Sequence, residues 1–273
     1  MDIKSTVTLN NLVKIPVLGL GVYLSKPGKE TYNAVRYALD IGYRHIDTAA
    51  LYANEEDVGK AVRDSGIARE EIFVTTKVWN ADQGFDNTIN AFSQSLRKLH
   101  FDYIDLYLIH WPEPKLRQET WRALIKLYDD KKAGSIGVSN YTIRHIEEVL
   151  HVSPFKPLIN QVEFSPYLYQ RDILAYCKTR NILVEAYTPL VRGKKFNEPK
   201  LVDIANKYSR TPAQILIRWA LQVGVIVLPK SVHEERIKEN ADVFDFEISE
   251  DDMDYMETFD ENYRVAWDPS KIG

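Results

Sequence analysis

Hydrophobic and polar residues follow two periods along the chain, one typical of strands and one typical of helices. Eight short runs are rich in Val, Ile, Leu and aromatic residues, as buried parallel strands are. We predict strands at 15–23, 43–49, 72–79, 103–111, 135–140, 158–164, 183–190 and 225–231. An earlier stretch, residues 5–16, alternates polar and apolar residues around Asn10-Asn11. It predicts a β-hairpin, because asparagine tolerates the positive φ that such turns need.

Helical patterns separate these strands. Residues 30–42 place apolar side chains on one face before Gly42, and residues 88–99 repeat them three to four positions apart. In residues 211–222, Thr211 can cap the helix and Pro212 stands in the first turn, where its missing N–H costs nothing. Two helical patterns, rather than one, separate the last two predicted strands.

Strands and helices that alternate in this way predict a parallel sheet covered by helices. The simplest closure is an α/β fold of the (β/α)8 TIM barrel type, for which roughly 250 residues is typical. The competing fold is an open, doubly wound sheet with a glycine-rich turn after its first strand. The nearest match, Gly19-Leu20-Gly21, lies inside a predicted strand and lacks a third glycine. We therefore predict one barrel domain over residues 1–273, with an N-terminal hairpin and a short C-terminal loop.

Composition and charge narrow the class of protein. The 273 residues are 45% hydrophobic and 27% charged, and the net charge of −4 argues against a nucleic-acid binder that uses a basic surface. No apolar run is long enough to cross a bilayer, and the start lacks the apolar core of a signal peptide, so we expect a cytoplasmic protein. The single Cys177 excludes an internal disulfide and a cysteine-based zinc site. No apolar surface stands out as an interface, and we expect a monomer.

Polar side chains stand at the carboxyl ends of the predicted strands, where barrel enzymes carry their chemistry. They are Tyr23, Asp47, Lys77, His110, Ser139, Asn140, Gln161, Tyr187, Lys230 and Ser231. Strands can simply turn polar where they reach solvent. That alternative does not explain why an Asp, a Lys and a His each follow so apolar a strand.

Asp47, Lys77 and His110 end neighbouring strands, and Tyr52 follows Asp47 by five residues. Because adjacent strands lie ~4.8 Å apart, these four side chains can converge over one mouth of the barrel. We expect an Asp47–Lys77 ion pair, and a Tyr52 phenol whose pKa the nearby ammonium lowers, so that it can act as a general acid. His110 would orient a substrate oxygen. Taken one at a time, each of these residues is as well explained by packing or solvent exposure.

A metal site is the other chemistry that barrel strand ends suggest. His45 and Asp47 lie two apart on one predicted strand, as ligands in barrel hydrolases can. No second His pair and no further carboxylates complete a ligand set, so we expect no metal.

Five segments make the pattern specific: GYRHIDTAALYANEEDVG (42–59), TTKVWN (75–80), DLYLIHWP (105–112), GVSN (137–140) and LPKSVHEERIKEN (228–240). They resemble the aldo-keto reductases, and the resemblance runs over essentially the whole chain. Among the subgroups, the chain is most similar to short bacterial and protist members, including 2,5-diketogluconate reductases and trypanosomatid prostaglandin F synthases.

The resemblance implies a set of site residues. The family's catalytic tetrad falls on Asp47, Tyr52, Lys77 and His110, the residues that the strand ends and the loop after Asp47 already indicated. NADPH would lie across the barrel mouth without a Rossmann fold. The cofactor residues implied are Ser139, Asn140 and Gln161 at the carboxamide, Tyr187 stacked on the nicotinamide, Thr188, Pro189 and Leu190 over the pyrophosphate, Lys230, Ser231 and Arg236 at the 2′-phosphate, and Glu239 and Asn240 at the adenine. The resemblance also implies that four aromatic residues line the substrate pocket. We call them the substrate wall; they are Tyr23, Trp79, Trp111 and Trp267.

The function implied is NADPH-dependent reduction of aldehydes or ketones, with hydride transfer to the carbonyl carbon and Tyr52 as the acid. The substrate could be a small aldehyde, a keto-sugar or prostaglandin H2, and the short tail suggests an open pocket with broad acceptance. The alternative is an NADP(H)-binding regulatory or interaction subunit on the same fold, against which the intact tetrad argues. The departures from the family pattern, Val22, Ser165 and Ala133-Gly134, bear on subgroup and substrate. At Val22 only the backbone could serve the cofactor.

Overall fold

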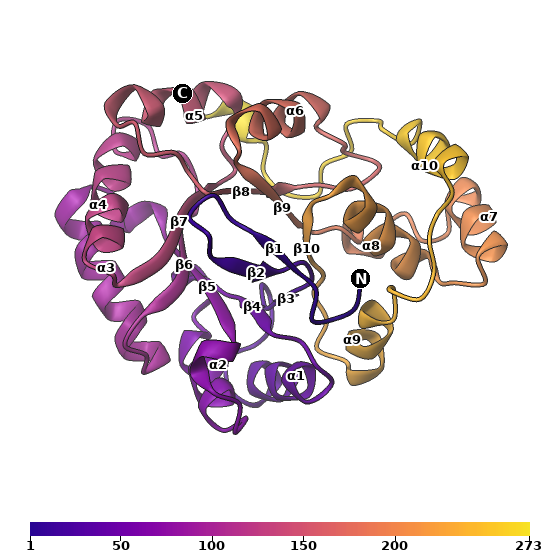
Figure 1. Ribbon diagram of the computed structural model, residues 1–273, viewed down its shortest axis with the longest axis horizontal. Helices are drawn as coiled ribbons and strands as arrows, with labels where there is room; N and C mark the ends of the chain where they lie inside the picture. Colours follow the sequence, from indigo (N-terminus) through magenta and orange to yellow (C-terminus); the bar gives the residue numbers. More distant parts are fainter.

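The computed structural model describes residues 1–273 and forms a closed parallel barrel. The barrel strands are β3 (Leu20–Gly21), β4 (His45–Asp47), β5 (Phe73–Val78), β6 (Ile104–Ile109), β7 (Ala133–Ser139), β8 (Ile159–Glu163), β9 (Leu183–Tyr187) and β10 (Ile226–Leu228). They pair in that order, and a bridge between Leu18 and Val227 joins the two edges. Helices ring the strands, as Figure 1 shows along the barrel axis. The predicted (β/α)8 fold is confirmed.

Ten α-helices accompany the strands: α1 (Lys29–Asp40), α2 (Glu55–Arg63), α3 (Phe85–Leu99), α4 (Arg117–Asp129), α5 (Ile143–Val152), α6 (Arg171–Arg180), α7 (Pro199–Lys207), α8 (Pro212–Val223), α9 (Glu234–Ala241) and α10 (Glu250–Glu257). Two of them, α7 and α8, separate β9 from β10 as expected. The Thr211 hydroxyl accepts from the N–H of Gln214, whose side chain accepts from the N–H of Thr211, so α8 begins with a capping box. No helix of the structure has the length and apolar character needed to cross a membrane.

The predicted first strand, 15–23, divides into two pieces. Lys14–Pro16 forms β2 of the hairpin, and only Leu20–Gly21 joins the barrel wall as β3. Between them the backbone passes very close to a neighbouring side chain. A Cβ added at Gly19 would lie 2.7 Å from His45 Nδ1, so only glycine fits there without a shift. The GLG segment therefore serves close packing at the barrel seam.

The N-terminal hairpin, β1 (Thr6–Thr8) paired with β2, covers the amino end of the barrel. Leu9 and Ile15 are buried there against Phe73 and Leu106 from the strands. The turn differs from the prediction. The residue with positive φ is Leu12 (φ 70°), whereas neither Asn10 nor Asn11 has one. Asn11 acts through its side chain, which donates to Gly134 O (3.0 Å) and accepts from Val13 N.

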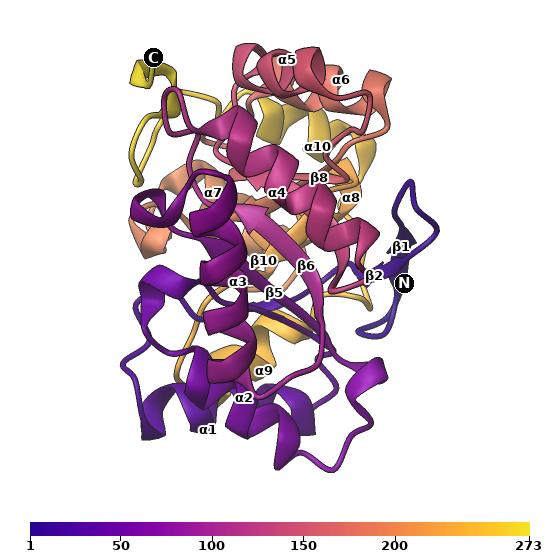
Figure 2. The same ribbon diagram turned by 90° about the vertical axis from the view of Figure 1, so that its left-hand side faces the viewer.

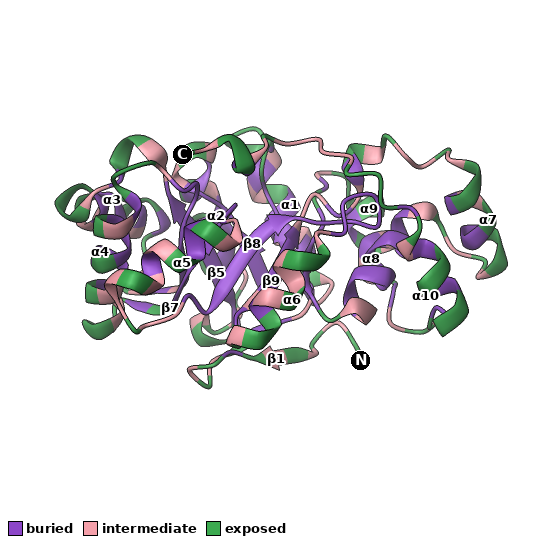
Figure 3. Ribbon diagram, turned by 90° about the horizontal axis from the view of Figure 1, so that it is seen from above, coloured by how far each residue is buried: buried purple, intermediate pink, exposed green.

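Burial follows the two layers of the barrel. Apolar residues fill the space between the strands and the inward faces of the helices, while the outer helix faces are exposed (Figure 3). The hairpin and the C-terminal tail lie at opposite ends of the barrel (Figure 2). The carboxyl ends of the strands therefore open on the side where the tail lies.

Candidate active site

Asp47, Lys77 and His110 are brought together by three neighbouring strands. Asp47 ends β4, Lys77 lies one residue before the end of β5, and His110 follows β6 directly. Lys77 is fully buried, and its Nζ donates to both Asp47 carboxylate oxygens (2.7 and 2.8 Å) and to Thr48 O (2.9 Å). All three ammonium protons are therefore used. The predicted ion pair is present, and removing one partner would leave a buried charge unpaired at about 3–5 kcal/mol.

Tyr52 stands in a short 3₁₀ turn, Ala50–Tyr52, that follows β4. Its ring lies with its centroid 5.2 Å from Lys77 Nζ, and it meets the His110 ring edge-on at 5.6 Å. Tyr23 also packs against the Tyr52 ring, with ring centroids 4.9 Å apart. The Tyr52 hydroxyl makes no hydrogen bond within the protein, so it is free to bond a ligand.

The expected direction of the Tyr52 pKa shift is wrong. Burial raises the pKa of the Tyr52 phenol well above its usual value, and the Asp47 carboxylate adds to the rise. Lys77 does not offset this, because Asp47 neutralises the ammonium at hydrogen-bond distance. Tyr52 is thus an uncharged phenol at any physiological pH, and it can still donate its proton.

His110 is buried, and its surroundings keep the ring neutral. Burial and the positive charge of Lys77 hold the pKa of His110 well below its usual value. The ring also meets Trp79 edge-on, with centroids 5.2 Å apart. Its Nδ1 is buried without a hydrogen-bond partner. A neutral imidazole in this position can donate one hydrogen bond without bringing a charge to the site.

A second polar group lies at the ends of β7, β8 and β9. Asn140, which has a positive φ of 63°, donates through Nδ2 to His110 O (3.0 Å) and accepts from the Tyr187 hydroxyl (2.7 Å). Ser139 Oγ donates to Gln161 O (2.9 Å). These four predicted residues are therefore tied to one another and to the backbone beside the tetrad.

Gln161 also links the tetrad to a residue that the sequence reasoning missed. Its Nε2 donates to Asp47 Oδ2 (2.8 Å) and to Glu185 Oε2 (2.6 Å). Glu185 is fully buried on β9, and its Oε1 lies 3.7 Å from His45 Nε2. A carboxylate inside the apolar run LVEAY, two positions before Tyr187 and hence on the same face of the strand, was the available signal.

The predicted substrate wall divides into a buried and an exposed part. Trp111 is buried, while Tyr23 and Trp267 are exposed. Trp267 comes from the tail and packs on Trp111 with ring centroids 5.5 Å apart. The tail is held there by Glu163, whose carboxylate accepts from the backbone N–H groups of Val265 (2.7 Å) and Ala266 (3.2 Å).

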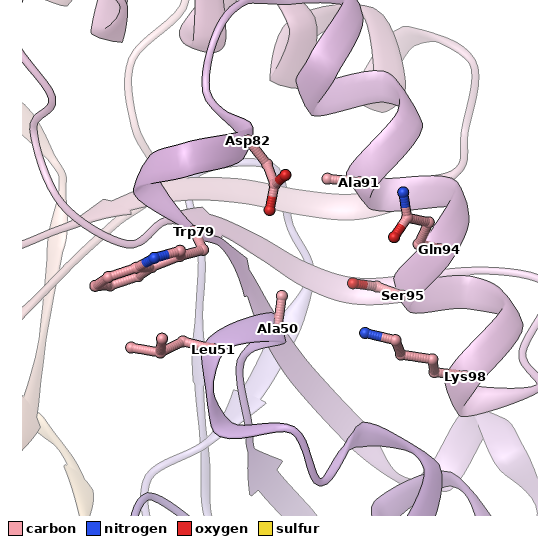
Figure 4. A pocket seen from close by; sticks show the side chains of 8 residues that line it. All are labelled: Ala50, Leu51, Trp79, Asp82, Ala91, Gln94, Ser95 and Lys98. Atoms are coloured by element: carbon pink, nitrogen blue, oxygen red, sulfur yellow. The ribbon is translucent and has the colours of Figure 1, made fainter.

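Behind the turn that carries Tyr52 lies a cavity of about 120 Å³ (Figure 4). Its lining residues come from that turn, from the segment after β5 and from α3, and are Ala50, Leu51, Trp79, Asp82, Ala91, Gln94, Ser95 and Lys98. Trp79 therefore contributes both to this cavity and to the edge-on contact with His110.

Comparison with known proteins identifies the family. The family model described as "Aldo/keto reductase family" matches residues 18–261. The chain belongs to the aldo/keto reductase family. It is an NADPH-dependent reductase of the kind that acts on small carbonyl compounds.

Three relatives illustrate how far the likeness extends. The glyoxal reductase of Bacillus subtilis is 48% identical over 271 residues, which cover 99% of this chain and 98% of the relative. The 9,11-endoperoxide prostaglandin H2 reductase of Trypanosoma cruzi is 47% identical over 269 residues, or 97% and 95% of the two chains. A solved structure of a Gox0644 mutant in complex with NADPH is 41% identical, with a TM-score of 0.93 over 98% of both chains.

The aldo-keto reductase carries residues whose chemistry fits the phosphate end of NADPH. Lys230 and Arg236 are exposed, and neither takes part in any ion pair. Lys230 directly precedes Ser231, and Arg236 lies in the first turn of α9, whose N-cap is His233 as expected. Two cations free of ion pairs near one helix start suit a dianionic phosphate.

Other predicted cofactor residues are only partly available. Glu239 accepts from the Thr211 hydroxyl, and Asn240 is buried. Thr188 has a positive φ of 53° as the chain turns after β9 towards Leu190. At Val22, the backbone N–H donates to Asp47 O and the carbonyl accepts from Asn54 Nδ2. Both backbone groups of Val22 are therefore already hydrogen-bonded within the protein.

Proposed function

We propose that this aldo-keto reductase converts small aldehydes and ketones to alcohols with Tyr52 as the proton donor. The observation that carries the proposal is a Tyr52 ring that contacts both the neutral His110 ring and Lys77 of the Lys77–Asp47 pair, with a hydroxyl that makes no hydrogen bond to the protein. NADPH supplies the hydride when it is bound.

The roles of the four residues follow from their contacts. Tyr52 donates its proton to the carbonyl oxygen as negative charge develops there. Lys77 lies against the Tyr52 ring and donates to Thr48 O, so it positions the turn that carries the phenol. Asp47 holds Lys77 in place. His110 donates a hydrogen bond to the same substrate oxygen and so fixes its position.

The cofactor contacts are proposed on the same basis. Ser139, Asn140 and the free Oε1 of Gln161 would bind the carboxamide, and Tyr187 would stack on the ring. Thr188 and Leu190 would cover the pyrophosphate, and Lys230, Ser231 and Arg236 would bind the 2′-phosphate. Glu239 and Asn240 would contact the adenine.

We further propose that residues 1–273 act as one barrel domain and as a monomer. Residues of the hairpin pack into the amino end of the barrel, and the tail is bonded to β8. A single light-scattering mass of one chain, independent of concentration, is the expected result. A stable dimer mass would contradict it.

The substrate class we favour is broad, covering small aldehydes, 2-oxoaldehydes, keto-sugars and larger oxygenated compounds. The wall residues Tyr23 and Trp267 are exposed, which leaves the mouth open and favours broad acceptance. The relatives named for glyoxal and for a prostaglandin endoperoxide stand at nearly equal identity, so both belong in the test panel. One strongly preferred substrate in a panel of aldehydes, 2-oxoaldehydes, keto-sugars and an endoperoxide would contradict broad acceptance.

The decisive experiment compares Tyr52→Phe with Tyr23→Phe. Both remove one hydroxyl from the same aromatic cluster. Tyr52→Phe should lower kcat with methylglyoxal by at least about a hundredfold, the range that general acids contribute, while NADPH binding is retained. Tyr23→Phe should stay close to the wild type. Equal turnover in both variants would remove Tyr52 from the role of acid, and wild-type protein that binds NADPH but reduces nothing would favour a regulatory subunit.

The phosphate proposal is tested by Arg236→Ala, with Lys238→Ala on the same helix as the control. The first variant should weaken NADPH binding far more than NADH binding, because only NADPH carries the 2′-phosphate. The control should change neither by much. Equal losses for NADPH and NADH in Arg236→Ala would contradict the assignment.

A further inference from the structure

Below the tetrad, inside the barrel, one amide joins two buried carboxyl groups. Gln161 Nε2 donates one hydrogen bond to Asp47 Oδ2 (2.8 Å) and one to Glu185 Oε2 (2.6 Å). Both N–H bonds of the amide are then used, so its plane is fixed and its oxygen is the only free group. This inference rests on the proposed function, in which that oxygen faces the nicotinamide carboxamide.

The charges enclosed around Glu185 do not balance if both carboxyl groups are ionised. Lys77 is the only cation near them, and Asp47 already holds it with two short contacts. His45 on β4 is uncharged, because burial lowers its pKa to about 3. Two carboxylates against one ammonium would leave a net negative charge away from water, which is costly.

No other element supplies a compensating charge. On β8, Glu163 bonds the tail backbone, and β10 and β3 contribute only Ile, Val, Leu and Gly. Burial and the negative charge of Asp47 raise the pKa of Glu185 to about 8. Between His45 and Glu185, whose Nε2 and Oε1 are 3.7 Å apart, the proton therefore resides on the carboxyl group.

We propose that Glu185 is a positioning residue, held as an uncharged carboxylic acid, that fixes the Gln161 amide and leaves Asp47 as the single counter-charge of Lys77. Its ionisation at alkaline pH adds a negative charge beside Asp47. That charge favours the cationic nicotinamide ring of NADP⁺ over the neutral ring of NADPH. The relative affinity for the two forms of the cofactor therefore changes as Glu185 titrates.

The main test is Glu185→Gln, which keeps the shape and an acceptor oxygen for Gln161 but cannot ionise. At pH 6.5 this variant should keep kcat close to the wild-type value. In the wild type, the ratio of the NADPH and NADP⁺ dissociation constants should change as the pH rises through about 8, and in Glu185→Gln it should stay flat. A ratio with the same pH midpoint in both proteins would overturn the proposal.

Infrared spectroscopy of the protein without cofactor detects the proton on Glu185 directly. The wild type should show the infrared carbonyl band of a buried, protonated carboxylic acid, which disappears as the pH rises through about 8 and is absent from Glu185→Gln. Glu55→Gln is the matched control. Glu55 is also buried, but it bonds Thr76 and lies outside this network, so its variant should keep the band. A wild-type protein without the band would overturn the proposal.

Glu185→Leu tests the positioning role, because it removes the acceptor at similar volume. One N–H of Gln161 then loses its partner, and kcat should fall by about tenfold to a hundredfold as the reacting groups lose alignment. A kcat that Glu185→Gln keeps and Glu185→Leu loses supports positioning through Gln161. Equal losses of kcat in the two variants contradict the proposal. The infrared band is independent of turnover, so it still tests Glu185 if Tyr52→Phe shows that the proposed reaction is wrong.

Discussion

The two ends of the barrel are built from the same strands, but an apolar cluster lies under the hairpin at one end and a polar cluster at the other. At the amino end, Leu9 and Ile15 of the hairpin close an apolar cluster that contains no titratable group. At the carboxyl end, a few residues further along, Asp47 and Lys77 form a buried pair. The apolar cluster stabilises the amino end because it excludes water. At the carboxyl end, burying Asp47 and Lys77 costs desolvation free energy. The apolar packing at the opposite end helps to offset that cost.

The largest effect is expected from Lys77→Met at the polar end. This change leaves Asp47 buried without its partner, so the free energy of unfolding should fall by about 3–5 kcal/mol and turnover should be lost. The double variant Asp47→Asn/Lys77→Met should recover stability in urea denaturation, since no unpaired charge remains, but not activity. Recovery of both would show that the pair is only structural.

The next effect is at the apolar end. Ile15→Ala removes a fully buried side chain from the hairpin, and the unfolding free energy should fall by about 2–4 kcal/mol. Because the cluster lies at the opposite end of the barrel from the tetrad, kcat/KM for methylglyoxal should not change at temperatures where the variant is folded. A loss of kcat/KM as large as the one in Lys77→Met would show that the two ends are coupled.

A smaller effect is expected from pH, and it comes from two buried groups inside the barrel, His45 and Glu185. The pKa of His45 is lowered to about 3 by burial, so the unfolded chain binds this proton more tightly and stability is lost as the pH falls below 6.5. The pKa of Glu185 is raised to about 8, so stability is lost as the pH rises from about 4.5 to 8. Denaturation between pH 4 and 9 should show Glu185→Gln removing the second loss, whereas Ile15→Ala should shift the whole curve downwards.

The smallest effect is expected at the hairpin turn. Leu12 is exposed and has a φ of 70°, a conformation that disfavours residues with a Cβ. Leu12→Gly should raise the unfolding free energy by about 0.5–1 kcal/mol, after the entropy that glycine adds to the unfolded chain is subtracted. The melting temperature is the readout. A decrease would show that the Leu12 side chain stabilises the turn in spite of its backbone conformation.

The strand pattern predicts the barrel well because parallel strands with both faces covered are apolar over their whole length. It also predicts that Asp47, Lys77 and His110 meet, since strands next to each other in the sequence are neighbours in the barrel. The pattern fails at residues 15–23, where a hairpin strand and a barrel strand are joined without a polar break.

The electrostatics of the site depend on distances that a sequence does not contain. Lys77 lies near Tyr52, as expected, but Asp47 neutralises it, so burial decides the direction of the Tyr52 pKa shift. Glu185 stands in an apolar strand, and only its contact with Gln161 shows that it belongs to the site. Asn11 holds the hairpin through side-chain hydrogen bonds, while an ordinary Leu12 adopts the unusual φ.

The tether between Glu163 and the tail has a consequence for how this enzyme can change. Glu163 holds Val265 and Ala266 through their backbone N–H groups, which every residue except proline possesses. The side chains of the tail, Trp267 among them, can therefore vary without loosening the attachment to β8. We therefore propose the tail as a replaceable part: a grafted tail would alter the proposed substrate wall at Trp267 and leave the barrel strands unchanged.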